Sequence, residues 1–513
     1  METEIKTEQT AGTMPADNKA NARISTDSDN KANAVSSTAS DNKARAVPAD
    51  GRRNGMPSDN KMGVMPVNRL LLNMALPMVF SMLMQALYNV VDSIFVARIV
   101  DDTVAGSAGT SALVAVGLAF PFQQLIMAVG IGTGVGMNAL LSRALGAGDK
   151  ETVNKAAVNG LFLEVCSAAV FFLIGLFFAE PLIRSQGGEG LSLEYGTQYL
   201  RIVCMCSIGV YLQMTFERTL QATGKTFYSM IAQMIGAVIN IIMDPILIFG
   251  YFGFPEMKVA GAAVATIFGQ LVAATVAIIF NIKKNPEVSL RLKGFRPDRH
   301  IIAKIYSVGL PSIIMQSIGS VMTYCMNRIL TTLNVDAVAV FTVYYKLQSF
   351  FFMPLFGLNN GMVPIIAFNY GARKRKRMTK TIRLSMMYGF IMTFLGFLAF
   401  EIIPDRLLLL FDTGDASLLT LGVPALRIIG THFLLAWFCI VSGSVFQALG
   451  NGVYSLIVSV ARQLVVLLPV AYLLARIGGL DLIWWCFPIA ELMSLVCSAG
   501  FLIAINKKII SKV

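Results

Sequence analysis

"ALPMVFSMLMQALYNVVDSIFVARI", residues 75–99, belongs to an apolar segment that begins near residue 71 and is long enough to cross a lipid bilayer as a helix. Within it, only Asp92 and Arg98 are charged. The rest of the chain is similar in character, because 55% of its 513 residues are hydrophobic, 14% are charged and the mean hydropathy is +0.65. A water-soluble protein of this length needs more polar surface. The sequence therefore predicts an all-α integral membrane protein.

Apolar segments of the same kind recur in regular order after Pro66. Each has at least the ~20 residues that a helix needs to cross the hydrocarbon layer. The segments lie near 71–99, 111–140, 156–179, 197–220, 227–249, 258–282, 302–332, 337–366, 381–404, 422–448, 453–475 and 481–505. We therefore expect twelve transmembrane helices.

Lys and Arg are concentrated in alternate loops between these segments. The strongest examples are the connection 283–304 and the run ARKRKRMTKTIR at 372–383. Cytoplasmic loops carry such an excess of basic residues, so both termini are expected in the cytoplasm, with the protein in a bacterial plasma (inner) membrane. The formal charge of +12 is then a topology signal and a source of contacts with anionic lipids. Nucleic-acid binding is not expected.

Residues 1–65 differ in composition from the rest. They contain no apolar run and repeat a short unit, DNKA at 17–20, 29–32 and 41–44 and DNKM at 59–62. Such a polar segment cannot bury enough apolar surface to offset its ordering entropy, which predicts a disordered cytoplasmic tail. It is interpreted as a dispensable extension, with a regulatory or docking role as the alternative.

Several functional classes find no support in the residue types. The only histidines are His300 and His432, and the seven cysteines have no zinc-like spacing. No nucleophile motif is evident. We expect no structural metal, no cofactor and no enzymatic activity.

The two halves of the chain resemble each other. GMNALLSRALGA at 136–147 matches GMVPIIAFNYGA at 361–372, and LQATGKTFYS at 220–229 matches FQALGNGVYS at 446–455. Because each repeat contains an even number of spans, the repeats are parallel and related by a pseudo-two-fold axis along the membrane normal. This predicts an N-terminal lobe at 66–282 and a C-terminal lobe at 305–513, joined by the basic linker 283–304. Two six-helix lobes are the geometry of a rocking, alternating-access carrier.

Polar side chains inside the membrane mark candidate sites, because burying them there is unfavourable. In the first span they fall at i, i+3, i+4 and i+7 and so share one helical face. Asn240 and Asp244, in NIIMDP of the fifth span, are also one turn apart, and Thr266 lies in the sixth span. The four residues of the first span are Gln85, Tyr88, Asn89 and Asp92.

Two carboxylates with nearby amide and hydroxyl oxygens are suited to Na⁺ or to a shared proton. The alternative is that Asp92 only accepts hydrogen bonds from a neighbouring helix. The second repeat favours the functional interpretation, because it lacks these groups. Met326 stands opposite Asp92, and Val466 and Val470 stand opposite Asn240 and Asp244.

Other buried polar groups are less decisive. Lys346 would repel cationic cargo or pair with an acid, and together with Arg328 and Glu164 it is a candidate for gating or for a charge pair. Each is also interpretable as a helix–helix contact. Met84 and Phe351 are candidates for an adaptable apolar wall around the substrate.

Three segments together resemble the multidrug and toxic compound extrusion (MATE) family. They are the first span, GIGTGVGMNALLSRALGAGD at 130–149 and FGLNNGMVPIIAFNYGARK at 356–374. The resemblance extends from about residue 67 to 510 and is strongest to the bacterial MepA-like branch, near the DinF type. It implies a twelve-helix antiporter that exports lipophilic, often cationic compounds in exchange for Na⁺ or H⁺.

Carried over to this chain, the DinF-type cation site falls on Asp92, Asn240, Asp244 and Thr266. Gln85 and Tyr88 match substrate-facing positions. Another branch of the family has an essential acid in the seventh span, where this chain has Arg328 and no acid.

Secondary active multidrug efflux is the leading hypothesis, with the transporter acting as a monomer. A flippase for lipid-linked oligosaccharides, which would share the fold, is the alternative because Lys346, Arg328 and Arg462 lie in the second half.

Overall fold

The computed structural model describes residues 60–97, 99, 108–290, 295–409 and 416–512. Over these residues, regular structure is helical throughout. The three DNKA repeats of the tail lie outside the described residues.

The first half of the chain contributes seven longer helices and two short ones. They are α1 (Lys61–Val64), α2 (Val67–Ala97), α3 (Ala108–Ala147), α4 (Lys150–Ser185), α5 (Gly190–Met205), α6 (Ile208–Ala222), α7 (Thr226–Phe249), the 3-10 turn η1 (Tyr251–Gly253) and α8 (Lys258–Lys284).

The second half repeats this order. Its helices are α9 (Arg299–Leu333), α10 (Val335–Gly371), α11 (Arg375–Ile402), α12 (Pro404–Leu409), α13 (Ala416–Gly430), α14 (Phe433–Ala448), α15 (Gly452–Val460), the π-helix η2 (Ala461–Leu467), α16 (Leu468–Ile483), α17 (Cys486–Lys508) and the 3-10 turn η3 (Ile510–Lys512).

Twelve membrane spans follow from these helices, as the sequence predicts. Among the described residues, ten helical stretches are individually long and apolar enough to cross a membrane. The other two spans are bent pairs, α5–α6 with a bend of 45° and α13–α14 with a bend of 51°. These are the fourth spans of the two repeats, so the bend is itself part of the duplicated architecture.

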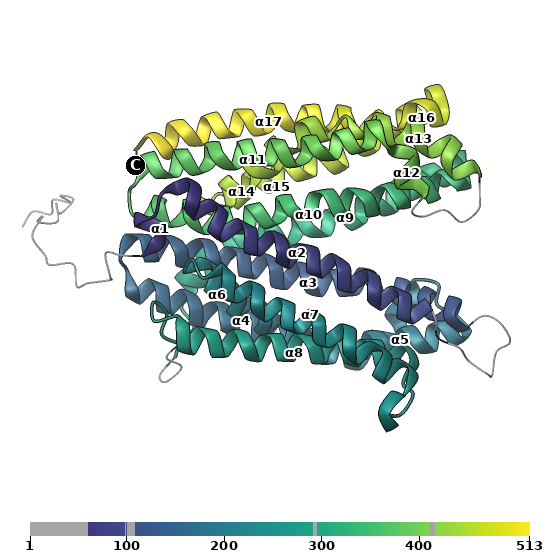
Figure 1. Ribbon diagram of the computed structural model, residues 1–513, viewed down its shortest axis with the longest axis horizontal. Helices are drawn as coiled ribbons and strands as arrows, with labels where there is room; N and C mark the ends of the chain where they lie inside the picture. The colour runs from purple at the N-terminus through teal and green to yellow at the C-terminus, as the bar shows by residue number, and fades with distance from the viewer. Residues whose placement is uncertain (1–59, 98, 100–107, 291–294, 410–415, 513) are drawn as a thin grey trace, which may run out of the picture. The chain divides into compact units, whose positions relative to one another are not determined.

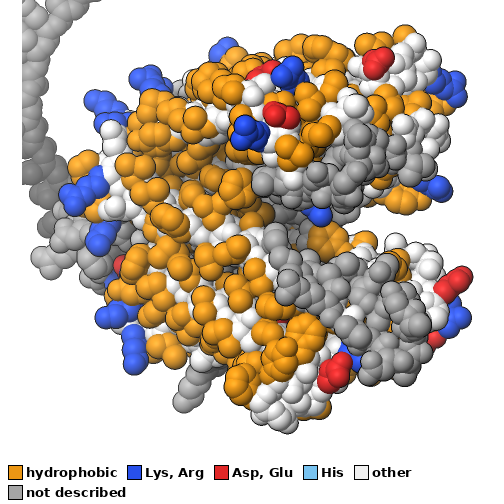
Figure 2. Space-filling model, turned by 45° about the vertical axis from the view of Figure 1, so that its right-hand side comes forward, with side chains coloured by type: hydrophobic (Ala, Val, Ile, Leu, Met, Phe, Trp, Pro, Cys, Tyr) orange, Lys and Arg blue, Asp and Glu red, His pale blue; other side chains and the backbone are white. Residues whose placement is uncertain are grey.

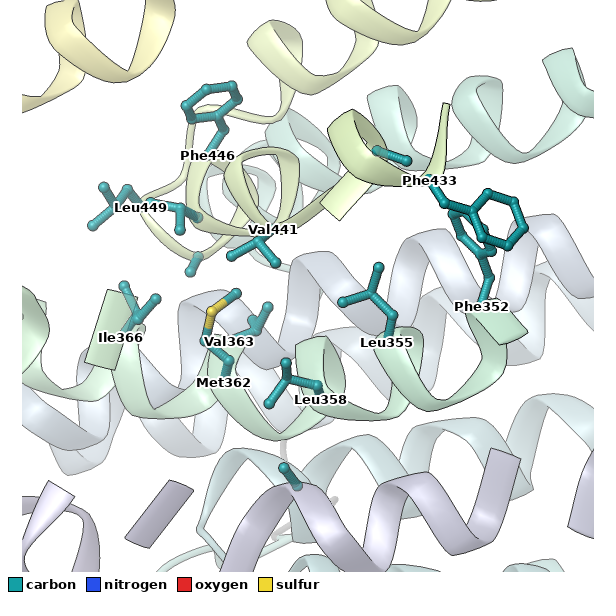
Figure 3. Packing of buried hydrophobic residues seen from close by; sticks show 14 of the residues in the cluster. Phe352, Leu355, Leu358, Met362, Val363, Ile366, Phe433, Val441, Phe446 and Leu449 are labelled. Carbon is teal, nitrogen blue, oxygen red and sulfur yellow. The ribbon is translucent and has the colours of Figure 1, made fainter. Parts of the chain in front are cut away.

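The spans form two lobes of six, which confirms the fold class expected from the repeat. Helices α2–α8 form the N-lobe and α9–α17 the C-lobe (Figure 1). Apolar side chains fill the interior of the C-lobe: Leu355 and Met362 of α10 lie opposite Val441 of α14 in one buried cluster (Figure 3). Lipid-facing side chains such as Phe177 and Leu395 are exposed, as expected for helices surrounded by hydrocarbon.

The lobes meet at one end, where Lys and Arg gather near residues 150, 225, 284 and 374; we call this the basic end. There α2 packs on α10, and α3 packs on both α9 and α10. Figure 2 shows Lys and Arg at this end and an open notch between the lobes at the other end.

Glycine makes this close meeting of the lobes feasible. A methyl group on Gly146 would lie 1.9 Å from the carbonyl oxygen of Phe368, and one on Gly371 would lie 2.0 Å from the carbonyl oxygen of Arg143. Gly146 and Gly371, like Arg143 and Phe368, are separated by 225 positions, so the two contacts are related by the pseudo-two-fold axis. Small residues allow backbones to approach in this way in membrane helices.

Helical structure extends beyond the boundaries that hydropathy indicates. Residues 61–64, assigned above to the tail, form α1, with the Asn60 side chain accepting a hydrogen bond from the Met62 amide at 3.0 Å. Likewise α9 begins at Arg299, within the predicted linker, because the Asp298 carboxylate caps it and accepts hydrogen bonds from two backbone amides. The hydrogen bond from the Ile301 amide lowers the pKa of Asp298.

Residues 60–65, which we call the N-terminal strap, connect the two lobes across the basic end. Met62 is fully buried and its Cγ lies 3.2 Å from the position that a Cβ would take on Gly224 of the N-lobe. From the C-lobe, Arg377 donates hydrogen bonds to the carbonyls of Met62 at 3.0 Å and Met65 at 2.7 Å. Lys374 donates to the carbonyl of Gly63 at 3.0 Å.

Removing Arg377 is expected to loosen this strap. Arg377→Ala loses the two hydrogen bonds to the strap, which together contribute roughly 3 kcal/mol to stability, and a third to Asn369 Oδ1 at 3.2 Å. We expect a melting temperature several degrees lower in a thermal-shift measurement on the purified protein. Lys376→Ala, an exposed position in the same turn, is the matched control. Equal melting temperatures for the two variants would show that the strap adds no stability.

Candidate functional site

Three helices of the N-lobe bring the predicted coupling residues together. Asp92 lies on α2, Asn240 and Asp244 lie on α7, and Thr266 lies on α8; α7 packs on both other helices. Asp244 is fully buried, Asn240 is 3% exposed and Thr266 is 9% exposed, while Asp92 is half-buried. The four residues are therefore neighbours in space although they span a large part of the N-lobe sequence.

A close crossing of α7 and α8 fixes this arrangement. A Cβ on Gly236 would lie 2.8 Å from the carbonyl oxygen of Gly269, and one on Gly269 would lie 2.7 Å from the carbonyl oxygen of Gly236. Asn240 follows Gly236 by one helical turn, and Thr266 precedes Gly269 by one turn. The crossing thereby places the two side chains opposite each other.

Hydrogen bonds join Asn240 to both Asp244 and Thr266, with the Asn240 amide as the donor in each. Asn240 Nδ2 donates to Asp244 Oδ1 at 3.4 Å and lies 3.4 Å from Thr266 Oγ1, to which it also donates. The Thr266 hydroxyl donates to the carbonyl of Ala262 at 2.9 Å. The donors of the cluster are thus already engaged.

Acceptor oxygens remain unpaired. Asp92 Oδ1, Asn240 Oδ1 and Asp244 Oδ2 are buried and have no hydrogen-bond partner among the residues that the structure describes. The Asp92 and Asp244 carboxylates also lie close enough to interact electrostatically. Buried acceptors of this kind normally have a donor. A proton or a hard cation such as Na⁺ would supply what the cluster lacks.

A buried carboxylate of the C-lobe, Glu491, differs from Asp92 and Asp244 because it has a cationic partner. In the π-helix η2, Arg462 Nη1 lies 3.2 Å from Glu491 Oε2, so a guanidinium neutralises that carboxylate permanently. Within the described part of the chain, neither Asp92 nor Asp244 has a Lys or Arg partner within 4.0 Å. Met326, the counterpart of Asp92, is fully buried among apolar side chains.

The polar face of α2 continues from Asp92 toward the basic end. Gln85 Oε1 accepts a hydrogen bond from Gln233 Nε2 of α7 at 3.5 Å, and Gln233 is also bonded to Ser81. Tyr88 is half-buried and bonded to Gln85. Met84 is half-buried on the same helix. The side chain of Asn89, a further predicted substrate contact, is outside what the structure describes.

Sequence reasoning missed some members of this face. Gln233 lies two turns before Asn240 on α7, and its polarity inside an apolar span was the available signal. Tyr199 of α5 interacts electrostatically with Asp92 and Tyr88, and its hydroxyl lies 3.4 Å from Gln123 Oε1 of α3. Tyr199 gives no sequence signal, because tyrosines are common in membrane helices.

The other predicted residues lie away from this cluster. Phe351 packs on Phe400 and Phe433 within the C-lobe. The Arg328 guanidinium lies 5.9 Å from the ring centre of Tyr324, and Lys346 is an exposed residue of α10. Glu164 is 1% exposed on α4.

The described residues contain no group of three or more His, Cys, Asp or Glu side chains that could hold a metal ion. The site is therefore organised around two aspartates, amides and hydroxyls.

Comparisons with known proteins identify relatives over most of the chain. The profile of the MatE family matches residues 77–246 and 311–473. The multidrug export protein MepA of Staphylococcus aureus strain MRSA252 is 27% identical over 438 residues, covering 85% of this chain and 93% of that protein. MepA of Staphylococcus haemolyticus is 27% identical over 424 residues, covering 82% and 90%.

Solved structures agree with this. The MATE multidrug transporter DinF-BH has a TM-score of 0.78 and 28% identity, covering 86% of this chain and 96% of that chain. An outward-facing MATE family transporter of the MOP superfamily has a TM-score of 0.81 at 24% identity, covering 89% and 100%, and supports the fold.

Proposed function

This chain belongs to the MatE family of multidrug efflux transporters, and on that premise we propose that it exports lipophilic, cationic compounds in exchange for inward H⁺ or Na⁺. Its relatives of the MepA type are named for multidrug export, and DinF-BH is named as a multidrug transporter. The coupling cation binds at Asp92, Asn240, Asp244 and Thr266. Substrate contacts Gln85, Tyr88 and Asn89, with Met84 in the adjoining wall.

One observation carries this proposal. Among the described residues, three buried oxygens on Asp92, Asn240 and Asp244 accept no hydrogen bond, while the Asn240 amide and the Thr266 hydroxyl already donate elsewhere. Such a set is unfavourable without a cation or proton. A site that must be filled by a cation or proton from outside the protein is what a cation-coupled antiporter requires.

The arrangement of the lobes supports an alternating-access cycle. Because basic loops remain in the cytoplasm, the basic end is the cytoplasmic end and both termini lie there. The lobes meet at this end through α2, α3, α9 and α10, so the conformation described is closed to the cytoplasm. Filling the aspartate site from outside and releasing its occupant inside would complete an alternating-access cycle.

Reconstituted protein distinguishes the two coupling ions. With purified transporter in proteoliposomes, we expect uptake or efflux of a fluorescent lipophilic cation to be driven by either an imposed Na⁺ gradient or an imposed pH gradient, and by neither in Asp92→Asn. Liposomes without protein control for leakage. Gradient-driven transport that is equal in wild type and Asp92→Asn would refute coupling at this site.

The flippase alternative gains no specific support. Of the cations that suggested it, Arg462 is ion-paired with Glu491 and is therefore not available to a pyrophosphate group.

A further inference from the structure

A carboxyl group of the N-lobe has no part in the site described above. Glu164 of α4 is 1% exposed, and neither of its carboxyl oxygens has a hydrogen-bond partner. It lies on the face of α4 turned toward α3, because Gly160, one turn earlier, packs directly on Met137. A carboxylate in such surroundings would be strongly destabilised, whereas a carboxylic acid would not. The geometry therefore favours the neutral, proton-bearing form.

The ionisable groups around Glu164 come from two helices. Arg218 and Tyr211 face it from α6, and Tyr306 faces it from α9 of the C-lobe. Tyr211 donates its hydroxyl to the carbonyl of Ile126 at 3.2 Å and is therefore engaged elsewhere. Two other helices, α3 and α5, also pack on α4. Among the described residues, neither presents a charged side chain to Glu164. Arg218 is thus the described cation that interacts with Glu164, and it also interacts with the neighbouring carboxyl group of Glu217.

In the closed conformation, however, Arg218 is held by the opposite lobe. Its Nη1 donates to Asn360 Oδ1 of α10 at 3.0 Å and to Gln221 Oε1 at 3.0 Å. Its side chain lies against Gly134 of α3, where an added Cβ would be 2.9 Å from Arg218 Cγ. In this closed conformation the guanidinium therefore donates to these two amides, and among the described residues no hydrogen bond joins it to Glu164.

A small polar cavity lies at this junction of the lobes. Arg218, Asn359, Asn360 and Ser444 are among the residues that line it. Neither the oxygen nor the nitrogen of the buried Asn359 amide has a protein partner. Polar cavities with unpaired amide groups are sites for water. This cavity therefore offers a place for water beside Arg218.

We propose that Glu164 is a second proton site, which holds its proton while Arg218 is bonded to Asn360 and releases it when the lobes separate at the basic end. On release the O–H bond of Glu164 breaks, and the proton passes to water at the basic end. The negative charge left on the carboxylate is balanced by Arg218, which separation from Asn360 has freed. Opening toward the cytoplasm and proton release are thereby linked through one arginine.

This inference rests on the alternating-access mechanism proposed above but not on the chemistry at Asp92. By linkage, a state that binds one proton fewer becomes about tenfold more populated for each unit rise in pH, within the window where that group titrates. The protonated state here is the closed one. Raising the pH therefore favours opening at the basic end, and a permanently neutral side chain at position 164 removes one proton from this dependence.

Spin labels test the link directly. In a full-length, cysteine-free background in lipid nanodiscs, we place labels at the exposed positions Lys283 of the N-lobe and Lys376 of the C-lobe and measure their separation by pulsed electron spin resonance from acid to alkaline pH. We expect the open fraction of the wild type to rise with pH. In Glu164→Gln the closed form should dominate. The slope, meaning the factor by which the ratio of open to closed protein changes per pH unit, should be about tenfold smaller than in the wild type.

Glu180→Gln is the control, since Glu180 is an exposed carboxylate of the same helix, α4, and is not among the groups that interact with Arg218. It should keep the wild-type slope. An unchanged slope in Glu164→Gln overturns the proposal. If that variant does not fold, infrared spectra of the wild type still decide: a protonated-carboxyl C=O band must persist at neutral pH in the closed state, and its absence refutes the proposal.

The two proposals fail separately. If coupling at Asp92 is wrong, Asp92→Asn transports normally, but the difference in slope between wild type and Glu164→Gln is unaffected. If Glu164 is only structural, Asp92→Asn still loses coupled transport while that difference disappears.

Discussion

Asp92→Asn is expected to reduce efflux of a lipophilic cationic dye to the level of host cells that lack the transporter. The substitution preserves the size of the side chain and its capacity for hydrogen bonds but removes the charge that a cation or proton would neutralise. It also removes the electrostatic interaction with Asp244 on which competition for one proton or cation depends. Dye efflux from energised cells measures the effect, with immunoblots of the membrane fraction to verify expression.

Asp481→Asn is the control for this substitution, because Asp481 is exposed on α16, far along the chain from the N-lobe cluster. It should export dye at the wild-type rate. The coupling role would be untenable if Asp92→Asn were expressed normally and cleared dye as fast as the control. A poorly expressed Asp92→Asn would instead favour the interpretation in which Asp92 only supports helix packing, and Asp92→Glu then tests whether charge alone restores transport.

Gly136→Ala is expected to abolish export through a different cause. A single methyl group on Gly136 would lie 2.1 Å from the carbonyl oxygen of Ile305 and 3.1 Å from the amide nitrogen of Gly309. Backbone cannot yield as the end of a flexible side chain does, so α3 and α9 would have to separate. The symmetry-related residue Gly361 packs closely on Ala75, so the loss on one side cannot be absorbed by the other.

The contact between α3 and α9 at Gly136 helps to close the basic end. We therefore expect Gly136→Ala to favour the conformation that is open at this end and to stop the transport cycle. Dye efflux in cells and the label separation between positions 283 and 376 measure the two consequences. Gly117→Ala on the same helix is the control, since a Cβ there meets nothing within 4 Å. Alanine should even stabilise α3 at that position by up to ~1 kcal/mol. Normal efflux in Gly136→Ala would mean that this contact is not needed for closure.

Much of the fold could be predicted from local properties of the chain. Hydropathy locates the spans, and the match between residues 136–147 and 361–372 predicts the two lobes and their symmetry. The bends at the fourth span of each lobe could not be foreseen, because an apolar segment reads the same whether it is straight or broken. Nor could the helical turn that Asp298 begins before the apolar stretch of α9.

The candidate site divides in the same way. The spacing of Gln85, Tyr88 and Asp92 predicts a shared face, and the structure places Asp92 beside the α7 cluster. The sequence does not distinguish a Phe351 that lines a cleft from one that packs in a core, because both positions are apolar. Its contacts with aromatic rings of α11 and α14 place it in the core of the C-lobe. Nothing in the sequence around Arg218 indicates that its side chain reaches across to Asn360 of the other lobe.

The sequence by itself determined that this protein is a duplicated bundle of membrane helices and that its N-lobe holds carboxylates that the C-lobe lacks, since burial in lipid depends on the length and polarity of each segment alone. Only the tertiary structure decided which charges have partners. Glu491 is neutralised by Arg462, whereas Glu164 and the pair Asp92 and Asp244 are not. That difference arises because the partners lie on helices that are distant in sequence. Close helix crossings at glycine residues bring these helices together, and the sequence of one segment does not show which other segment it will cross.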